Sequence, residues 1–348
     1  MSSLTGVTAS SVLGLLLVAA PALAQTEQLT VVGAGGALQE AEQKAFFRPF
    51  AETHKVQLTE DSYSGQMAKV RAMVDTKSVT WDVLQVEQNS MLAGCEEGIF
   101  EKVDWSAIGN RSDFIPEAYS DCGVGAFVWS MVLSFDRAKL KDGPKSWADF
   151  WNTERWPGKR GLRQTAKMTL EIALLADGVP PAQVYDVLAT PQGVDRAFTK
   201  LDQLKPNILW WTSGAEPIER LASGDVVLSA AFNGRVSAAN QAGRSFALLW
   251  DGQIYGIDYW GIIKGSKHRD TAQRFLAFAS RPDVQAVFPK HIAYGVTNKQ
   301  ATPLIDKAVL ANLPTAPENM ANAIEISDAF WLENLDRLNE RFNKWVAR

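Results

Sequence analysis

Three strand–turn–helix units follow one another near the start of the chain, and this succession constrains the fold more than any other feature. Each unit begins with a short apolar run: Leu29–Val32, Val56–Leu58 and Trp81–Val86. Strands that alternate with helices form a parallel sheet, and ligands bind where such strands end. The sequence therefore predicts an α/β fold with a ligand site near the glycine turn Gly33–Gly36 and near Glu87, which follows the third run.

Two long extended stretches, 124–135 and 255–263, flank a second α/β region. Two α/β blocks joined by two crossing strands indicate a clamp with two hinged lobes around a shared cleft. We expect residues 25–130 and 259–301 to form lobe 1, and residues 131–258 and 302–348 to form lobe 2.

The N-terminus has the pattern of a signal peptide over residues 1–24. The apolar run Val12–Ala20 is much shorter than the roughly 20 residues that cross a bilayer. Ala22 and Ala24 then provide the small residues of a cleavage site, so the mature chain should begin near Gln25 in the periplasm. No Lys or Arg precedes the run, so a buried N-terminal helix stays an alternative.

The charge, cysteine and histidine content limit which partners, disulfides and metal sites we expect. The net charge of -4 and the scattered basic residues argue against a nucleic-acid partner. In an oxidising compartment, Cys95 and Cys122 are expected to form a disulfide, with two free thiols as the alternative. The three histidines are far apart in the sequence, so we expect no metal site, and nothing indicates a cofactor.

Catalysis is not expected. The sequence has no Gly-x-Ser-x-Gly motif, and neither cysteine has a histidine partner by any local signature. The least favoured alternative function is a periplasmic hydrolase, in which Glu87 and Asp258 would act as acid and base.

Several short motifs occur in a familiar order. They are Trp81-Asp-Val-Leu, Ser146-Trp-Ala-Asp-Phe-Trp, Ala231-Phe-Asn-Gly, Tyr255-Gly-Ile-Asp-Tyr-Trp and Ser280-Arg-Pro-Asp-Val. Over nearly the whole mature chain this order resembles the bacterial extracellular solute-binding proteins, and more narrowly the spermidine/putrescine-binding branch of the ABC importers. The resemblance implies a type II periplasmic-binding fold, a monomer without catalytic activity, and a membrane permease with its ATPase as partners.

The resemblance also implies ligand residues. Asp258 stands where the family has an ammonium-binding aspartate, and Phe232 stands where it has an aromatic ring. Tyr255 and Trp260 flank Asp258 and would add ring faces, which attract cations. Three further positions depart from the family: Thr165 replaces an expected acid, Gly256 an expected ring, and the Gly33–Gly36 turn an aromatic segment. We expect the backbone of Gly35 and Gly36 to bind a polar or anionic group of the ligand.

Polar residues around the second block favour an anionic group on the ligand. Asn233 and Arg235 begin a helix, and a helix N-terminus with an arginine suits a carboxylate, as does Arg163. Alternatively, Arg235 pairs with an acid such as Glu87. Trp211 ends a strand and either lines the cleft or packs inside.

The predicted function is the capture of a small amine, either a polyamine or a zwitterion such as an ω-amino acid, for import. Thiamine, an aminophosphonate and a carboxylate are alternative ligands. A chemosensory receptor is the alternative partner.

Overall fold

A computed structural model describes residues 1–2, 26–63 and 65–348 of the chain. Nearly all of the predicted signal peptide, residues 3–24, lies outside these described residues.

The strands of the described residues form one mixed sheet in the order β2-β1-β3-β8-β4-β7-β5-β6, with β9 paired to β8. Two parallel groups, β2-β1-β3 and β7-β5-β6, stand at opposite ends, while β4 and β8 run antiparallel between them. The strand bounds are β1 Gln28–Gly33, β2 Gln57–Ser62, β3 Val83–Glu87, β4 Gly123–Phe135, β5 Arg160–Arg163, β6 Ile208–Trp211, β7 Leu228–Phe232, β8 Leu249–Ile262 and β9 Ile324–Glu325.

Helices cover both faces of each parallel group. Their bounds are α1 Gly36–Glu42, α2 Arg48–His54, α3 Met67–Asp75, α4 Gln88–Glu96, α5 Trp105–Ile108, α6 Trp147–Phe150, α7 Ala166–Ala176, α8 Val184–Leu188, α9 Pro191–Leu204, α10 Glu216–Ser223, α11 Asn233–Gln241, α12 Arg269–Ala279, α13 Pro282–Gln285, α14 Lys307–Leu310 and α15 Asp328–Val346. A π-helical turn, η1 Gln43–Phe47, joins α1 to α2. Short 3-10 turns are η2 Arg111–Asp113, η3 Pro116–Ala118, η4 Pro181–Gln183, η5 Lys205–Asn207, η6 Phe288–Lys290 and η7 Lys299–Leu304.

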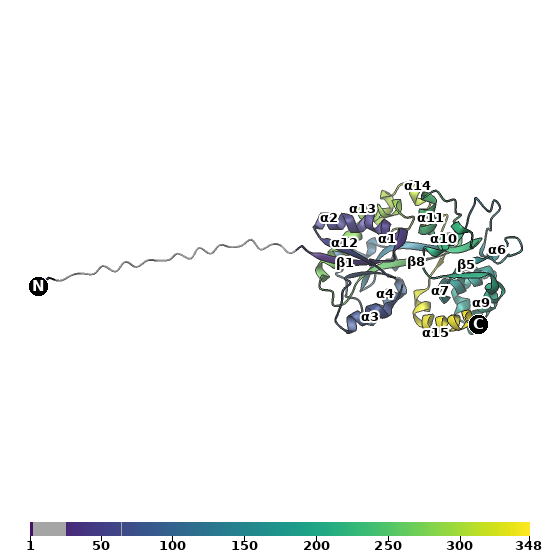
Figure 1. The fold of residues 1–348 in the computed structure, drawn as a ribbon, viewed down its shortest axis with the longest axis horizontal. Helices are drawn as coiled ribbons and strands as arrows, with labels where there is room; N and C mark the ends of the chain where they lie inside the picture. The colour runs from purple at the N-terminus through teal and green to yellow at the C-terminus, as the bar shows by residue number, and fades with distance from the viewer. Residues whose placement is uncertain (3–25, 64) are drawn as a thin grey trace.

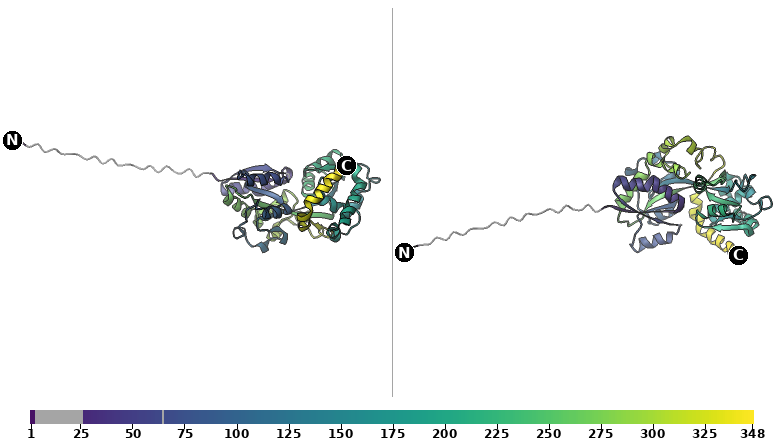
Figure 2. Two further views of the ribbon diagram at one scale, coloured as in Figure 1. Left: turned by 90° about the horizontal axis from the view of Figure 1, so that it is seen from below. Right: turned by 45° about the horizontal axis from the view of Figure 1, so that its top comes forward.

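The molecule has two halves (Figure 1), each with one part of the sheet between helical layers. In the first half, α1, α2 and α12 lie on one side of β1, and α3 and α4 lie on the other. In the second half, α10 and α11 face α7, α9 and α15 across the sheet, and Figure 2 shows both halves from two further directions. The ends of β3, β5 and β7, at Glu87, Arg163 and Phe232, line one shared cavity.

The crossing strands have the length and composition of buried strands. All thirteen residues of β4 are buried, which fits the near-continuous apolar runs of strands that are covered on both faces. The structure confirms the predicted α/β fold with two crossing strands, and extends the second crossing back to Leu249.

The proposed lobe boundaries stay a prediction, but one segment packs differently from that division. Ile305 and Leu313 belong to the same apolar cluster as Ala286 and Val296. The neighbouring turn η6 packs on the first half, where the ring centroids of Phe46 and Phe288 are 5.0 Å apart. Residues 305–313 therefore pack against a segment that we assigned to lobe 1.

The cysteines form the predicted disulfide. Cys95 in α4 is bonded to Cys122 just before β4, with 5.6 Å between the Cα atoms. The bond closes a loop with a sequence separation of 27. Within the first half, it ties a helix near the strand ends to the first crossing strand.

Removing this disulfide should reduce stability without changing the ligand site. In the chain-entropy model, a loop of this size implies that Cys95→Ser with Cys122→Ser lowers the free energy of unfolding by about 3 kcal/mol. Urea denaturation of the oxidised protein and the double variant measures this difference. Equal midpoints and slopes would contradict it.

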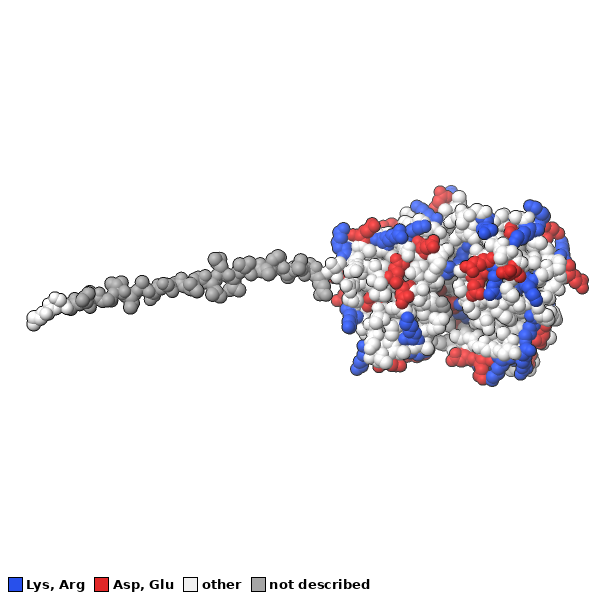
Figure 3. Space-filling model, in the orientation of Figure 1, with Lys and Arg blue, Asp and Glu red and all other residues white. Residues whose placement is uncertain are grey.

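Among the described residues, no helix has both the length and the apolar character needed to span a bilayer. On the face seen in Figure 3, acidic and basic side chains are interspersed over both halves.

Candidate functional site

A cavity of about 310 Å³ lies where the strand ends of the two halves meet. This volume is at the lower end of the roughly 300–1,000 Å³ that small-molecule sites usually have. Its wall combines rings, amides and charges from both halves: Ala34, Leu38, Tyr63, Gly65, Gln85, Val86, Glu87, Asn89, Ser90, Phe127, Trp129, Arg163, Thr165, Lys167, Thr212, Ser213, Gly214, Phe232, Arg235, Asp258, Tyr294, Leu335 and Asn339.

Asp258 contributes a buried carboxylate from the middle of β8. It stands opposite Glu87 of β3 and opposite Phe127 of β4. Trp129 donates a hydrogen bond from Nε1 to one carboxylate oxygen at 2.6 Å, and the side-chain amide of Gln85 donates to the other. Two neutral donors thus fix the orientation of the carboxylate.

No Lys or Arg forms an ion pair with Asp258 among the described residues. Burial raises its pKa to about 6, and the nearby charge of Glu87 adds to this effect. The hydrogen bonds from Gln85 and Trp129 favour the ionised form but do not offset the burial. An incoming ammonium group would supply the missing positive charge.

The glycine at position 256 makes room for this arrangement. Gly256 pairs with Trp129 across the two crossing strands, and a Cβ added there would lie 2.9 Å from the indole ring. The aromatic ring that the family resemblance places at this position is therefore absent, and the ring of Trp129 lies beside the glycine instead.

Glu87 is the second carboxylate of the wall, and it already has cationic partners. Arg163 lies with Nη1 at 3.2 Å from Oε1, and Lys167 forms an ion pair with Oε2. Burial alone would raise the pKa of Glu87, but Lys167 and Arg163 together lower it to about 2. Because Glu87 belongs to the first half and both cations belong to the second, this cluster connects the two halves.

Arg235 is a buried cation that forms no ion pair with an acid of the described residues; it interacts at longer range with Glu42, whose pKa burial raises well above its usual value. Its Nη2 donates to the backbone carbonyls of Gly35 at 3.1 Å and Ala34 at 3.3 Å, and the described residues provide no carboxylate within ion-pair distance. A Cβ at Gly36 would lie only 2.6 Å from Nη1, and Gly36 has a φ of 58°, so the turn requires glycine there.

Aromatic rings line the space beside these charges. Trp129 and Phe232 meet edge to face with centroids 5.3 Å apart, and Phe127 stacks on Tyr294 at 5.1 Å. The guanidinium of Arg163 lies 5.6 Å from the ring centroid of Phe232. The wall therefore provides apolar surface with one unpaired acid and one unpaired cation.

Six residues that we named from the sequence as candidate ligand residues lie on the cavity wall: Glu87, Asp258, Phe232, Arg235, Thr165 and Arg163. Whether they bind a ligand stays a prediction. The suggested pair between Arg235 and Glu87 does not form, because Arg163 and Lys167 occupy Glu87.

The structure places the other predicted aromatic residues away from the cavity wall. Trp260 is buried in the first half, where its ring packs edge to face on Phe46. Trp211 is fully buried behind Phe232, with its ring edge to face at 5.9 Å. Tyr255 is not on the cavity wall, and its hydroxyl donates to Glu325 at 3.1 Å beside β9.

The structure also places the remaining predicted polar residues outside the cavity wall. Asn233 is fully buried, accepts from the backbone N–H of Ser130 at 3.0 Å and donates to the carbonyl of Ala293 at 2.5 Å. The N–H of Gly35 is used by the side chain of Gln39 at 3.1 Å. The turn Gly35-Gly36 thus receives Arg235 on a carbonyl instead of offering the Gly35 amide to a ligand.

Sequence reasoning missed Gln85, Trp129 and Lys167. The first two had a usable signal, because alternation along a strand places Gln85 on the face of Glu87 and Trp129 on the face of Phe127. Lys167 had none, because its contact with Glu87 depends on the irregular backbone near the start of α7.

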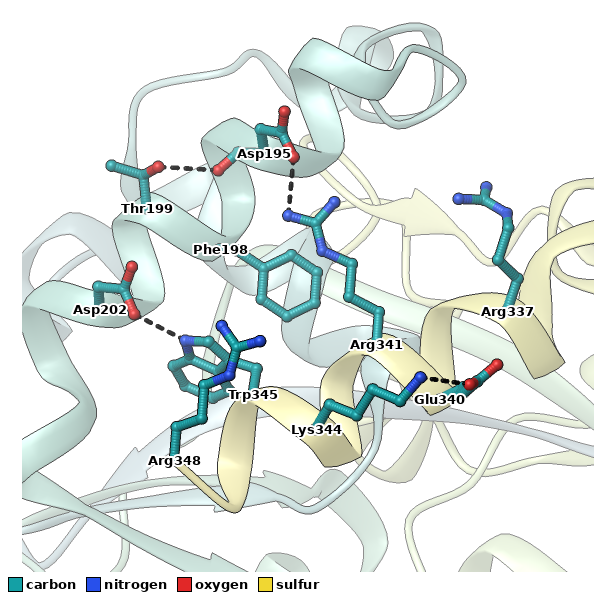
Figure 4. A pocket seen from close by; sticks show the side chains of 10 residues that line it. All are labelled: Asp195, Phe198, Thr199, Asp202, Arg337, Glu340, Arg341, Lys344, Trp345 and Arg348. Atoms are coloured by element: carbon teal, nitrogen blue, oxygen red, sulfur yellow. Dashed lines mark hydrogen bonds and ion pairs between the residues drawn. The ribbon is translucent and has the colours of Figure 1, made fainter.

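A second hollow, of about 530 Å³, lies on the outside of the second half between α9 and α15 (Figure 4). Its charges largely satisfy each other: Arg341 lies 2.7 Å from Asp195, and Trp345 donates to Asp202 at 2.6 Å. It has no contribution from the strand ends where the two halves meet, so we do not assign the ligand site to it.

Comparison with known proteins identifies the family of the chain. The family model of bacterial extracellular solute-binding proteins matches residues 45–318. A gamma-aminobutyric acid-binding protein of Pseudomonas aeruginosa is 50% identical over 333 residues, which cover 96% of this chain and 95% of that protein. The spermidine/putrescine-binding periplasmic protein of Escherichia coli is 27% identical over 266 residues, covering 73% and 72%.

Among solved structures, the PBP MotA from A. tumefaciens B6 in complex with glucopine matches with a TM-score of 0.86 and 32% identity. The match covers 92% of this chain and 99% of that one. These similarities confirm the resemblance inferred from the sequence motifs: the chain belongs to the bacterial extracellular solute-binding proteins.

Proposed function

We propose that the protein captures a zwitterionic ω-amino acid of the 4-aminobutyrate class in the periplasm and presents it to an ABC permease with its ATPase. One observation carries this proposal: the same cavity holds an acid without a cation, Asp258, and a cation without an acid, Arg235. A ligand with an ammonium group at one end and a carboxylate at the other satisfies both.

The physical reason is the cost of burying an unpaired charge. A desolvated ammonium needs an opposite charge, and a buried guanidinium gains most from a carboxylate. The rings of Trp129, Phe127 and Phe232 would enclose the methylene groups between these two ends. No other pair of wall residues offers unpaired charges of both signs among the described residues.

The charge balance of the wall favours a zwitterion over a polyamine. Arg163, Lys167 and Arg235 are three cations against the two acids Glu87 and Asp258. Because Glu87 is neutralised by its own partners, a diamine would find a carboxylate for only one of its ammonium groups. The named ligand of the relative at 50% identity, gamma-aminobutyric acid, supports the same class.

A thermal-shift panel tests the proposal. We expect 4-aminobutyrate to raise the melting temperature, since a ligand at 100 times its dissociation constant stabilises by about 2.7 kcal/mol. Butyrate, n-butylamine, putrescine, spermidine, thiamine and 2-aminoethylphosphonate at the same concentration should give smaller shifts. A larger shift with putrescine or spermidine would contradict the proposal that the ligand is a zwitterion. A larger shift with butyrate would contradict the proposal that the ligand carries an amine.

Binding should weaken in acid because Asp258 must be ionised to hold an ammonium. The pKa of Asp258 is about 6 in the absence of ligand, so the carboxylate is fully available above pH 7 and protonates as the pH falls through 6. At pH 5 about a tenth is ionised, which predicts an affinity about tenfold lower than at pH 8.

Isothermal titration calorimetry at pH 8, 6 and 5 measures this dependence for 4-aminobutyrate. Circular dichroism at each pH serves as the control for the fold. n-Butylamine should show the same decline, because its ammonium would use the same carboxylate. A constant dissociation constant from pH 8 to pH 5 would remove Asp258 from the ligand site.

A further inference from the structure

Lys167 places an ammonium group of the protein inside its own ligand cavity. The side chain is 6% exposed, and its Nζ contacts two acceptors from the first half. One is the carboxylate of Glu87, and the other is Oδ1 of Asn89 at 2.7 Å. A carboxylate and an amide oxygen that converge on one nitrogen provide acceptors for two of the three N–H donors of a primary ammonium.

The backbone of α7 is interrupted where Lys167 stands. Lys167 has φ −60° and ψ 134°, and Met168 has φ 70° and ψ −36°, so two residues near the start of α7 leave the helical conformation. A positive φ at a residue with a side chain is unfavourable and persists only where the surrounding structure imposes it. Packing within α7 does not require this irregularity. It occurs at the residue whose side chain reaches Glu87 in the other half.

Glu87 and Asp258 stand opposite each other on β3 and β8, so their side chains share one face of the sheet at neighbouring positions. Both line the same cavity. Without Lys167, Arg163 would remain on Oε1 of Glu87, but Oε2 of Glu87 and Oδ1 of Asn89 would be open to a ligand ammonium. A short diamine would then find one acceptor site there and a second at Asp258.

We propose that Lys167 determines ligand specificity by excluding diamines: its Nζ occupies the second ammonium site, which Glu87 and Asn89 form. The residue acts as an internal substitute for the far ammonium of a diamine. Only the site at Asp258 then remains open to a ligand amine. This inference rests on the proposed function, because it explains why a cavity with two acids accepts a ligand with one amine.

The test is Lys167→Ala, which removes the internal ammonium and empties the space that it fills. Isothermal titration calorimetry should show that at least one of 1,3-diaminopropane, putrescine and cadaverine binds the variant with an affinity about tenfold or more above that for the unmodified protein. n-Butylamine, with a single ammonium, should change by less than about threefold. Lys167→Ser serves as a second variant, with a hydroxyl near the vacated site.

The double variant Lys167→Ala with Glu87→Gln is the matched control, and it should lose the gain for diamines because the acceptor carboxylate is gone. If none of the three diamines gains affinity in either single variant, or if n-butylamine gains equally, the proposal is overturned. Retention of the gain in the double variant also overturns it. This test uses only amines as ligands, so its outcome does not depend on whether the protein binds 4-aminobutyrate. Failure of 4-aminobutyrate to bind the unmodified protein would contradict the proposed function alone.

Discussion

Replacing Asp258 with asparagine is expected to weaken binding of 4-aminobutyrate by about 100-fold or more. Loss of one partner from a buried charge pair costs roughly 2–5 kcal/mol, and the ammonium of the ligand has no other unpaired carboxylate in the cavity. The asparagine has nearly the same shape, and it can still accept the hydrogen bond from Trp129. Isothermal titration calorimetry of the two proteins measures the change.

The fold of this variant should be retained. Since burial raises the pKa of Asp258, its ionised form opposes folding above the pKa, and the stability associated with the neutral form is lost as the pH rises through about 6. A permanently neutral side chain should therefore leave the melting temperature of the ligand-free protein at pH 7 unchanged or higher. Unaltered affinity for 4-aminobutyrate would exclude Asp258 from the site, and a lower melting temperature would contradict the account of its burial.

Replacing Arg235 with methionine is expected to weaken binding of 4-aminobutyrate by a similar factor, about 100-fold. The guanidinium is the only cation of the described cavity wall that has no carboxylate partner, so the ligand carboxylate would lose its counter-charge. Arg235→Lys should recover part of the loss, since a lysine keeps the charge but not the two-pronged geometry of a guanidinium.

Arg235 also bonds to the carbonyls of Ala34 and Gly35 on the opposite half, so its loss can act on closure of the two halves as well. n-Butylamine separates the two effects because it has no carboxylate yet would occupy the same closed cavity. We expect its affinity to change by less than about threefold in Arg235→Met. Equal weakening of both ligands would assign Arg235 to closure alone and contradict its role at the carboxylate.

Much of the fold was predictable because it depends on patterns that a sequence displays directly. The succession of apolar runs and helices predicted the parallel groups, and the two long extended stretches predicted β4 and β8. The pairing of Cys95 with Cys122 followed from the presence of only two cysteines. The boundary near residues 305–313 was not predictable, since it depends on which half an irregular segment packs against.

The site was only partly predictable, and β8 shows why. Asp258 and Trp260 lie on the same face of this strand by alternation, but β8 passes through both halves and only its middle borders the cavity. Trp260 lies two residues further along, in the core of the first half. Tyr255 has the opposite parity to Asp258, so alternation would have excluded it from the same face.

Two further residues depend on information that the sequence does not contain. Lys167 reaches Glu87 because α7 is irregular near its start, and no local pattern announces this interruption. Asn233 follows a strand end, as a ligand residue would, but its amide group is used between the backbones of β4 and the segment before Tyr294. Long-range contacts decide both cases.

The crystal structure of the protein with 4-aminobutyrate tests the central claim most directly. The account predicts the ammonium group within hydrogen-bonding distance of the Asp258 carboxylate, the carboxylate of the ligand on Arg235, and Lys167 still bound to Glu87. A ligand with the reverse orientation, or one whose ammonium displaces Lys167 from Glu87 while Asp258 stays unoccupied, would contradict it.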